Sequence, residues 1–281
     1  LVLGTGSVLD VDAAEIVDAL TVGQFASANL DADLTIGAND SDSNVSGDVQ
    51  GSGTLIQDGT GTVTINGTNT VNVDLQVDAG TLLLDGTTTG RVTVNNGGTL
   101  TGTGTVGDGD DSLTVNSGGT VGPGASIGTL SINGDVAFAP NATYMAELNA
   151  SGNSADLLNV TDVAGTVLFG VGSIVDLSQL DAGDFLADEL FTIVTAPNFG
   201  ATDVGTITLN SSITGATFEL QINGDDMQVQ ASLGIEWSGT DSSNWNDAAN
   251  WGGTAPQAGD NLIFTGAGSA PTNNDFAADT N

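Results

Sequence analysis

The sequence predicts an all-β protein, in which a parallel β-solenoid (β-helix) segment is followed by an antiparallel β-sheet or sandwich-like cap. Val, Leu and Ile alternate with Thr, Ser and Asn along most of the 281 residues, as they do in half-buried strands. The 41 glycines are spread along the chain at expected turn positions between strands, not gathered in one block. Many short strands end in Asn-Gly, Asp-Gly or Gly-Gly, which tolerate the positive φ of tight turns.

A Gly-Thr-apolar motif recurs in the first half of the chain and predicts stacked coils. It begins at Gly53, Gly80, Gly98, Gly119 and Gly128, so that successive spacings are 27, 18, 21 and 9 residues. Strands as short as those between the motifs bury a face only when coils stack on one another, which predicts solenoid coils over residues 1–137. The competing interpretation is an antiparallel sandwich with Asn-Gly hairpins. The strands are TVTIN, VNVDLQV, TLLLDG, RVTVNN, SLTVNS and TLSING.

Three further segments complete the expected organisation. Residues 13–20, AAEIVDAL, are the best helix candidate and form either a helical excursion from an early coil or an ordinary β-coil. Strands lengthen and aromatic residues become frequent after about Pro140, so residues 138–234 are predicted to be antiparallel strands that cap the open end of the solenoid. Residues 235–281 hold all three tryptophans and are predicted to begin a next module or a linker.

The charge balance excludes several classes of partner. The chain has 35 acidic residues, one cation (Arg91), no His and a formal net charge of −34. Such a surface has no cationic patch for nucleic acid or for anionic membranes. Self-repulsion of this size favours surroundings rich in salt or divalent ions, as outside the cell. No stretch is long and apolar enough for a membrane helix, and the absence of an initiator Met at Leu1 suggests a processed chain or a segment of a longer one.

Several stretches resemble the autotransporter-associated β-strand repeat proteins, which are large secreted proteins of bacterial surfaces. They are LTGTGTV, LTVNSGGTVGPGASIGTLSINGDVAFAPNATYMAELN and SADLLNVTDVAG. The tryptophan-rich segment, with the PxxGD of residues 256–260, is similar to the unit that opens a new module in these proteins. The resemblance covers roughly residues 50–281. It implies an exported, elongated β-helical passenger on the bacterial cell surface.

Catalysis by familiar routes has few residues to use. Without His, Cys or Lys the chain cannot form a Ser-His-Asp triad, a thiol nucleophile or a Schiff base. Carboxylate pairs could cleave a glycosidic bond, but adjacent acids on a strand point to opposite faces. Residues 39–137 also contain no aromatic platform for a sugar. We therefore expect no enzyme activity and no cofactor other than a calcium ion. The adjacent acidic pairs are Asp110 with Asp111, Asp188 with Glu189, and Asp225 with Asp226.

Calcium is the strongest site hypothesis, against the alternative of solvated acidic turns. Residues 107–113 match the G-x-G-x-D-x-L core of the calcium-binding nonapeptide repeat, but no second copy lies adjacent. Residues 40–48 have the alternating oxygen spacing of a calcium loop, although Val45 stands where an EF-hand needs Gly and no Glu closes the loop. The predicted calcium ligands are Asp108, Asp110, Asp111, Asp40, Asp42, Asn44 and Asp48.

The sequence therefore predicts a secreted, non-enzymatic structural module that builds a stiff acidic rod in an extracellular fibre, stalk or surface layer. Its expected partners are other copies of itself or further modules of the same chain. One alternative is an adhesin that binds glycans or a partner surface through Trp237, Trp245 and Trp251, although large aromatic residues more often anchor packing. A second alternative is a polysaccharide-active β-helix enzyme.

Overall fold

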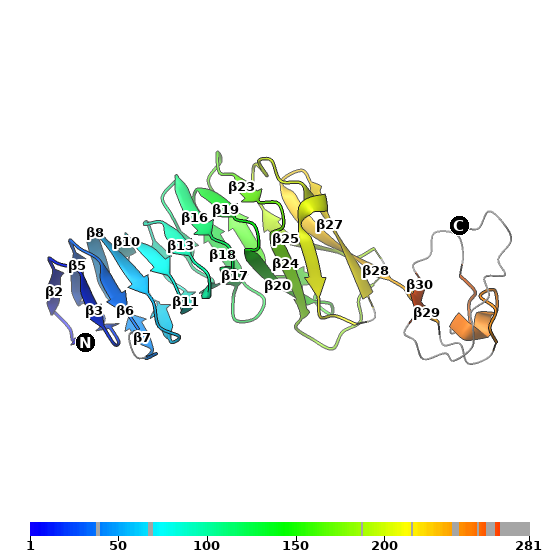
Figure 1. Ribbon diagram of the computed structural model, residues 1–281, viewed down its shortest axis with the longest axis horizontal. Coiled ribbons are helices and arrows are strands. Elements are labelled where there is room, and N and C mark those ends of the chain that lie inside the picture. The colour runs from blue at the N-terminus through cyan, green and yellow to red at the C-terminus, as the bar shows by residue number, and fades with distance from the viewer. Residues whose placement is uncertain are drawn as a thin grey trace.

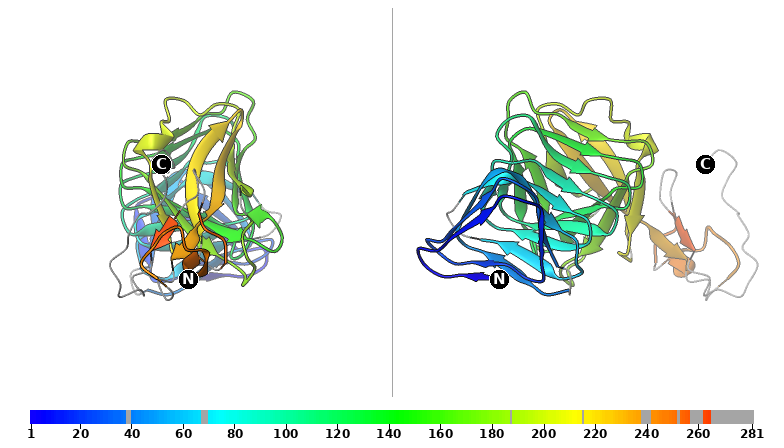
Figure 2. Two further views of the ribbon diagram at one scale, coloured as in Figure 1. Left: turned by 90° about the vertical axis from the view of Figure 1, so that its right-hand side faces the viewer. Right: turned by 60° about the vertical axis from the view of Figure 1, so that its left-hand side comes forward.

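The computed structural model is a parallel β-solenoid whose coils stack side by side along the long axis of the molecule (Figure 1). It describes residues 1–37, 40–66, 70–186, 188–214, 216–237, 242–251, 253–256 and 262–264. Each early coil has three sides, and the first coil shows a three-sided outline (Figure 2, right). The predicted all-β class is confirmed, and the antiparallel sandwich is wrong for the coils, because their ladders are parallel.

The first side, called sheet A here, is a single path of parallel strands, one from each coil. Ten of the eleven described strands of this sheet follow one another along the path, and β21 (Ser154–Ala155) pairs antiparallel with β20 outside it. The path is β1 (Val2–Leu3), β4 (Thr21–Val22), β7 (Ser43–Val45), β9 (Thr62–Ile65), β11 (Gly80–Leu84), β14 (Gly98–Gly102), β17 (Thr120–Pro123), β20 (Thr143–Asn149), β24 (Ile174–Gln179) and β26 (Thr208–Ser211).

The second and third sides are joined by two long strands, β8 (Asp48–Gln57) and β10 (Thr70–Val77), that turn the corner between them. The second side contains β2 (Val8–Val11), β5 (Ser27–Leu30), β12 (Thr87–Thr88), β15 (Thr105–Val106), β18 (Thr129–Ile132), β22 (Leu157–Val160) and β25 (Leu190–Thr195). The third side contains β3 (Glu15–Val17), β6 (Leu34–Ile36), β13 (Val92–Val94), β16 (Asp111–Val115), β19 (Asp135–Phe138) and β23 (Val167–Phe169).

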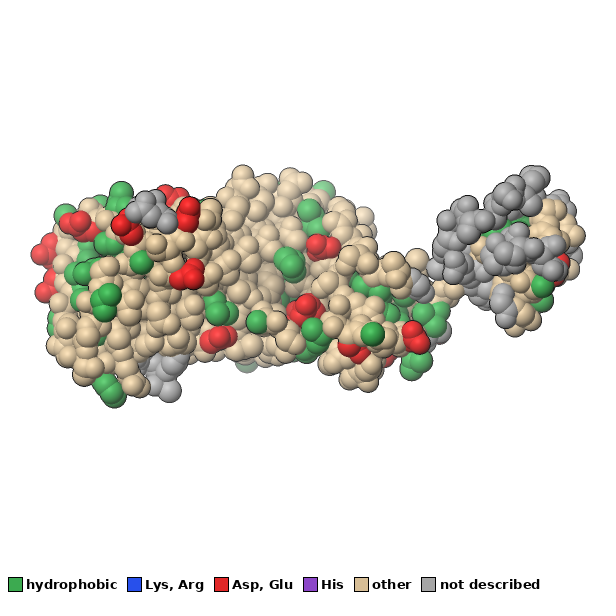
Figure 3. Space-filling view, turned by 90° about the horizontal axis from the view of Figure 1, so that it is seen from below, with side chains coloured by type: hydrophobic (Ala, Val, Ile, Leu, Met, Phe, Trp, Pro, Cys, Tyr) green, Lys and Arg blue, Asp and Glu red, His purple; other side chains and the backbone are tan. Residues whose placement is uncertain are grey.

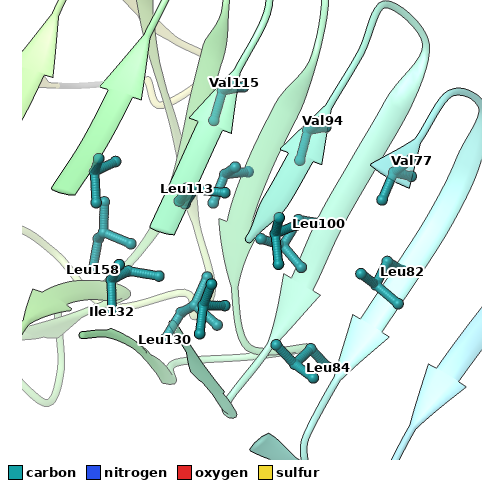
Figure 4. Packing of buried hydrophobic residues seen from close by; sticks show 14 of the residues in the cluster. Val77, Leu82, Leu84, Val94, Leu100, Leu113, Val115, Leu130, Ile132 and Leu158 are labelled. Atoms are coloured by element: carbon teal, nitrogen blue, oxygen red, sulfur yellow. The ribbon is translucent and has the colours of Figure 1, made fainter. Parts of the chain in front are cut away.

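The core is built from files of apolar side chains, because in-register parallel strands place equivalent residues above one another. Val77, Val94 and Val115 occupy one register position on successive coils and point into the interior (Figure 4). The same file continues into Phe138 and Phe169, whose rings stack with centroids 4.5 Å apart and planes 3° from parallel. The aromatic residues of the second half therefore fill a wider interior.

The register explains the loose spacing of the Gly-Thr motif. Gly80 pairs with Gly98, and Thr99 pairs with Thr120, so these motifs repeat at one position of sheet A. The motif at Gly53 lies in β8, and the motif at Gly128 leads into β18 on the second side. The first and last spacings are irregular because the motifs at Gly53 and Gly128 lie outside sheet A, whereas the other three lie within it.

Strand pairing decides two points of secondary structure. Residues 15–17 form β3, paired in parallel with β6, so of the two alternatives for AAEIVDAL the ordinary β-coil is confirmed and the helical excursion is wrong. The predicted antiparallel pairing within residues 138–234 is wrong for β20, β24 and β26, which continue sheet A in parallel, and for β23, which continues the third side, so antiparallel strands make up only the last part of this range. The length and aromatic content of the parallel strands reflect a wider solenoid. The division of domains at 137/138 stays a prediction, although paired strands cross it.

Antiparallel pairing does close the second side, as expected of a cap. Strand β28 (Asp226–Leu233) pairs antiparallel with β25 on one edge and with β27 (Ala216–Asn223) on the other. A short 3-10 helix, η1 (Val204–Thr206), precedes β26. Beyond the hairpin, β29 (Ile235–Trp237) pairs in parallel with β30 (Leu262–Phe264), and η2 (Ala248–Trp251) lies between them in sequence. Residues 257–261, including most of the PxxGD motif, and residues 265–281 lie outside the described residues.

Candidate functional site

The acidic loop of residues 40–48 faces the following coil. The carboxylate of Asp40 accepts a hydrogen bond from the Thr60 N–H at 3.0 Å, and that of Asp42 accepts one from the Thr62 N–H at 2.8 Å. Hydrogen bonding to Thr60 lowers the pKa of Asp40 below its ordinary value, because it stabilises the ionised form. Both aspartates connect neighbouring coils.

The other two predicted ligands of this loop point elsewhere. The Asn44 side-chain oxygen accepts a hydrogen bond from the Ser46 hydroxyl at 2.7 Å, and that hydroxyl also lies 2.7 Å from the Asn66 side-chain oxygen. Asp48 is exposed at the start of β8. A calcium ion needs six to eight oxygens converging on one point, and the structure does not bring these four side chains together as such a set.

The second acidic stretch, residues 107–111, forms a turn between β15 and β16. Gly107 and Gly109 have φ of +88° and +130°, values that favour glycine. Asp108 and Asp110 line a hollow of about 210 Å³ together with Arg91, the only cation of the chain. Asp111 begins β16, and its side chain is outside the described part of the structure.

Calcium binding stays a prediction. Among the described residues, no three acidic side chains are placed to hold one metal ion. What the geometry does show is a structural use for aspartate, since carboxylates repeatedly accept a backbone N–H from the next coil. We call these contacts inter-coil aspartate bonds. They join Asp33 to Thr54, Asp40 to Thr60, Asp42 to Thr62, Asp74 to Arg91, Asp85 to Thr103 and Asp135 to Thr166.

Asp156 was missed by the sequence analysis and is the most perturbed carboxylate that the structure describes. It is only 3% exposed, and its two oxygens accept hydrogen bonds from the N–H groups of Gly128 and Glu147, each at 2.9 Å. Burial, helped by the nearby charge of Glu147, raises the pKa of Asp156 to about 6 against the lowering effect of the two hydrogen bonds. No sequence motif marks this residue, because its burial depends on the antiparallel turn from β20 into β21.

The three tryptophans form a structural cluster in the part that is described. Trp237 and Trp251 are 3% and 4% exposed, with ring centroids 4.9 Å apart, and the Trp251 ring N–H donates to the Trp245 carbonyl at 2.6 Å. Asn250 is fully buried, and its side-chain amide donates to the carbonyls of Ser242 and Asn244. Burial of two rings leaves little aromatic surface for a sugar, so the geometry favours the packing interpretation over the glycan interpretation.

Comparison with known proteins gives a partial match to an extracellular protein. No family model matches the sequence. A curated relative, an extracellular serine protease from Serratia marcescens, is 38% identical over 109 residues, which cover 39% of this chain and 10% of that protein. The predicted resemblance to an autotransporter passenger β-helix is confirmed.

The match to a solved structure is more remote. The Haemophilus influenzae Hap adhesin aligns with 80% of this chain and 24% of its own chain, at 16% identity and a TM-score of 0.33. The chain therefore spans about a tenth of the curated relative and about a quarter of the solved one. Among the described residues, no helix has the length and apolar character needed to cross a membrane.

Proposed function

We propose that the chain is a non-catalytic, load-bearing segment of an extracellular surface protein, and that it serves as a stiff acidic rod. The observation that carries this proposal is the continuity of the ladders, since sheet A alone runs through ten successive strands. Inter-coil aspartate bonds add polar contacts along the same axis. Each coil contacts mainly its neighbours, so bending the rod requires breaking hydrogen bonds in register.

We infer that this segment does not carry a Ser-His-Asp protease centre. The curated relative is called a serine protease, but a Ser-His-Asp centre needs a histidine as its base, and the chain has none. Of the adjacent acidic pairs, Asp226 accepts a hydrogen bond from the Thr195 hydroxyl at 2.8 Å, and Asp188 accepts one from the Gln230 amide at 3.3 Å. These contacts support a structural role for both carboxylates.

The rod proposal is tested by measuring particle length. Nine spacings of roughly 4.8 Å between the strands of sheet A predict about 43 Å of solenoid. Deleting residues 99–119 removes one coil and joins register-equivalent positions, because Thr99 pairs with Thr120. The deletion should shorten the particle by roughly 5 Å in small-angle scattering while preserving the strand signal in circular dichroism. An unchanged length or a collapsed particle would contradict the proposal.

Extension of the rod by self-association at its N-terminal end is part of this proposal. The outer edges of β1, β2 and β3 can pair either with further coils of the same chain or with another copy, and self-association is the second of these routes. Strand edges are sites of strand addition, and the large apolar side chains near these edges would be covered by either kind of added coil. A monomer that stays monodisperse at high concentration with calcium present would count against this extension. The exposed fractions are 75% for Val2, 59% for Val8, 70% for Ile16 and 76% for Phe25.

A further inference from the structure

A groove of about 200 Å³ lies between sheet A and the loop that follows β17. The side of the molecule seen from below in Figure 3 carries mostly uncharged surface with scattered acidic groups and no basic ones. The loop is held against the sheet by the Thr101 hydroxyl, which donates to the Gly124 carbonyl at 2.5 Å, and by Asp156, which accepts the Gly128 N–H. The groove is lined by Thr99, Thr101, Gly122, Pro123, Gly124, Ala125, Met145, Glu147, Asp156 and Ser178.

Gly122 opens the floor of this groove, although the backbone does not require glycine there. It lies within β17 in register with Thr101, and its φ is outside the left-handed region. A Cβ at Gly122 would make ordinary contact with the Met145 Cβ at 3.4 Å, whereas one at Gly51 or Gly102 would overlap a carbonyl oxygen of the preceding coil. A glycine inside a strand often marks close approach by a ligand or another backbone, and the nearest backbone atom to this position in the described structure, the Met145 carbonyl oxygen, lies 3.8 Å away and would not clash with a Cβ.

The walls of the groove combine an apolar surface with carboxylates at one end. Met145 is 45% exposed, and the exposed Ala125 lines the loop side of the groove, whereas Pro123 is the buried last residue of β17. Glu147 and the buried Asp156 supply the negative charge. The chain provides no compensating cation there, because its only one, Arg91, lines the separate hollow beside Asp108.

We propose that this groove docks a lysine side chain of a partner protein. The aliphatic stem would lie over Met145 and Ala125 in the space left by Gly122, and the ammonium group would face Glu147. Lysine fits because it joins a flexible apolar stem to a compact charge. The −34 net charge excludes anionic ligands, and the lining provides no aromatic surface for a sugar. This proposal holds for a rod of any length and is independent of the test of the rod.

The test uses the full chain labelled with ¹⁵N and two neutral-ended tripeptides, acetyl-Gly-Lys-Gly-amide and acetyl-Gly-Gln-Gly-amide. We expect the lysine peptide to shift the amide signals of Gly122, Gly124, Met145 and Glu147 in a saturable way, and the glutamine peptide to leave them in place. A bound ammonium should also lower the pKa of Asp156 from about 6, because a nearby opposite charge favours the ionised form. Shifts spread evenly over the acidic turns would overturn the proposal, since they indicate general charge attraction.

Two variants and one control complete the test. Gly122→Thr fills the floor with the residue that Thr101 already places on the preceding coil, and Glu147→Gln removes the charge that faces the ammonium. Each should weaken lysine-peptide binding about tenfold or more. Glu219→Gln removes the same charge from an exposed position on β27 and should leave binding within about twofold. Equal binding by Gly122→Thr and the unmodified chain, with both folded by circular dichroism, would overturn the proposal.

Discussion

The carboxylate of Asp42 accepts a hydrogen bond at 2.8 Å from the backbone N–H of Thr62, one coil further along the solenoid. Asp85 and Thr103 repeat this relationship at 3.0 Å. A chain with 35 acidic residues and one cation cannot pair most of its carboxylates with positive side chains. Backbone N–H groups at the turns take that role, because a carboxylate is a strong acceptor for them.

Replacing Asp42 with alanine is predicted to destabilise the solenoid, since the Thr62 N–H loses its partner. We expect a lower midpoint of urea unfolding for Asp42→Ala with an unchanged slope. The matched control is Asp48→Ala, which removes an exposed carboxylate that forms no side-chain hydrogen bond among the described residues. If removal of charge governs stability, Asp48→Ala will raise the midpoint, and Asp42→Ala will raise it equally.

The calcium hypothesis predicts a separate effect at the turn of residues 107–111. A bound ion stabilises the folded state by mass action, so the melting temperature should be higher in calcium than in a chelator. The difference should disappear in Asp108→Asn and in Asp111→Ala, and it should persist in Asp203→Asn, which alters an acidic residue that caps η1. Identical melting with and without calcium would refute a specific site.

Asp156 is predicted to make the protein more stable as the pH falls from 7 toward 4. Its pKa is about 6 in the folded state against 3.8 for the ordinary group, so the folded state binds a proton more tightly and gains stability across that window. Asp156→Asn should remove this gain. The measurement is the difference in the free energy of unfolding between the two proteins at several pH values, which should widen in favour of the unmodified protein as the pH decreases.

Asp40 and Asp181 act in the opposite direction at lower pH. Hydrogen bonds lower the pKa of both groups below 3.8, with Thr60 as the main cause for Asp40 and Ser151 for Asp181. Their contribution is present above the ordinary pKa and is lost as the pH falls through the folded value. Stability should therefore pass through a maximum near pH 4 to 5. A steady fall in stability from pH 7 downward would contradict both assignments.

The stacked rings of Phe138 and Phe169 are predicted to be a major source of stability in the wider half of the solenoid. Phe138 is 1% exposed, and its replacement by alanine leaves a cavity that should cost about 3–5 kcal/mol of unfolding free energy. Phe25→Ala is the control, because this side chain is 76% exposed and should change stability by less than about 0.5 kcal/mol. Equal losses in the two variants would show that ring stacking contributes nothing.

Local sequence patterns were sufficient to predict the solenoid. Alternation of apolar residues identifies strands, and recurrence of the Gly-Thr motif at Gly80, Gly98 and Gly119 follows the true register of sheet A. Strand direction after residue 138 could not be predicted in the same way, since parallel and antiparallel strands share one alternating pattern. Residues 15–17 could not be assigned from sequence alone either. Their local pattern is compatible with a helix, but pairing with β6, which is a tertiary contact, makes them a strand.

The candidate sites were harder to predict than the fold. Spacing of aspartates suggested ion ligands, but whether Asp40 and Asp42 face an ion or the next coil depends on where Thr60 and Thr62 lie. Burial of Asp156 depends on a turn between two strands, and the opening at Gly122 depends on a loop that returns over the sheet. None of these relationships is local in sequence.

The antiparallel pairing of β28 with β25 also sets the direction in which such a protein can evolve. Duplication of a coil ahead of β25 reproduces a parallel edge that the next coil can extend, as the matched register of β14 and β17 shows. A duplicated coil placed after β28 would meet a strand of the opposite direction on the second side. Coil duplications are therefore compatible with the fold when they fall before β25, and they are incompatible with it when they fall after β28.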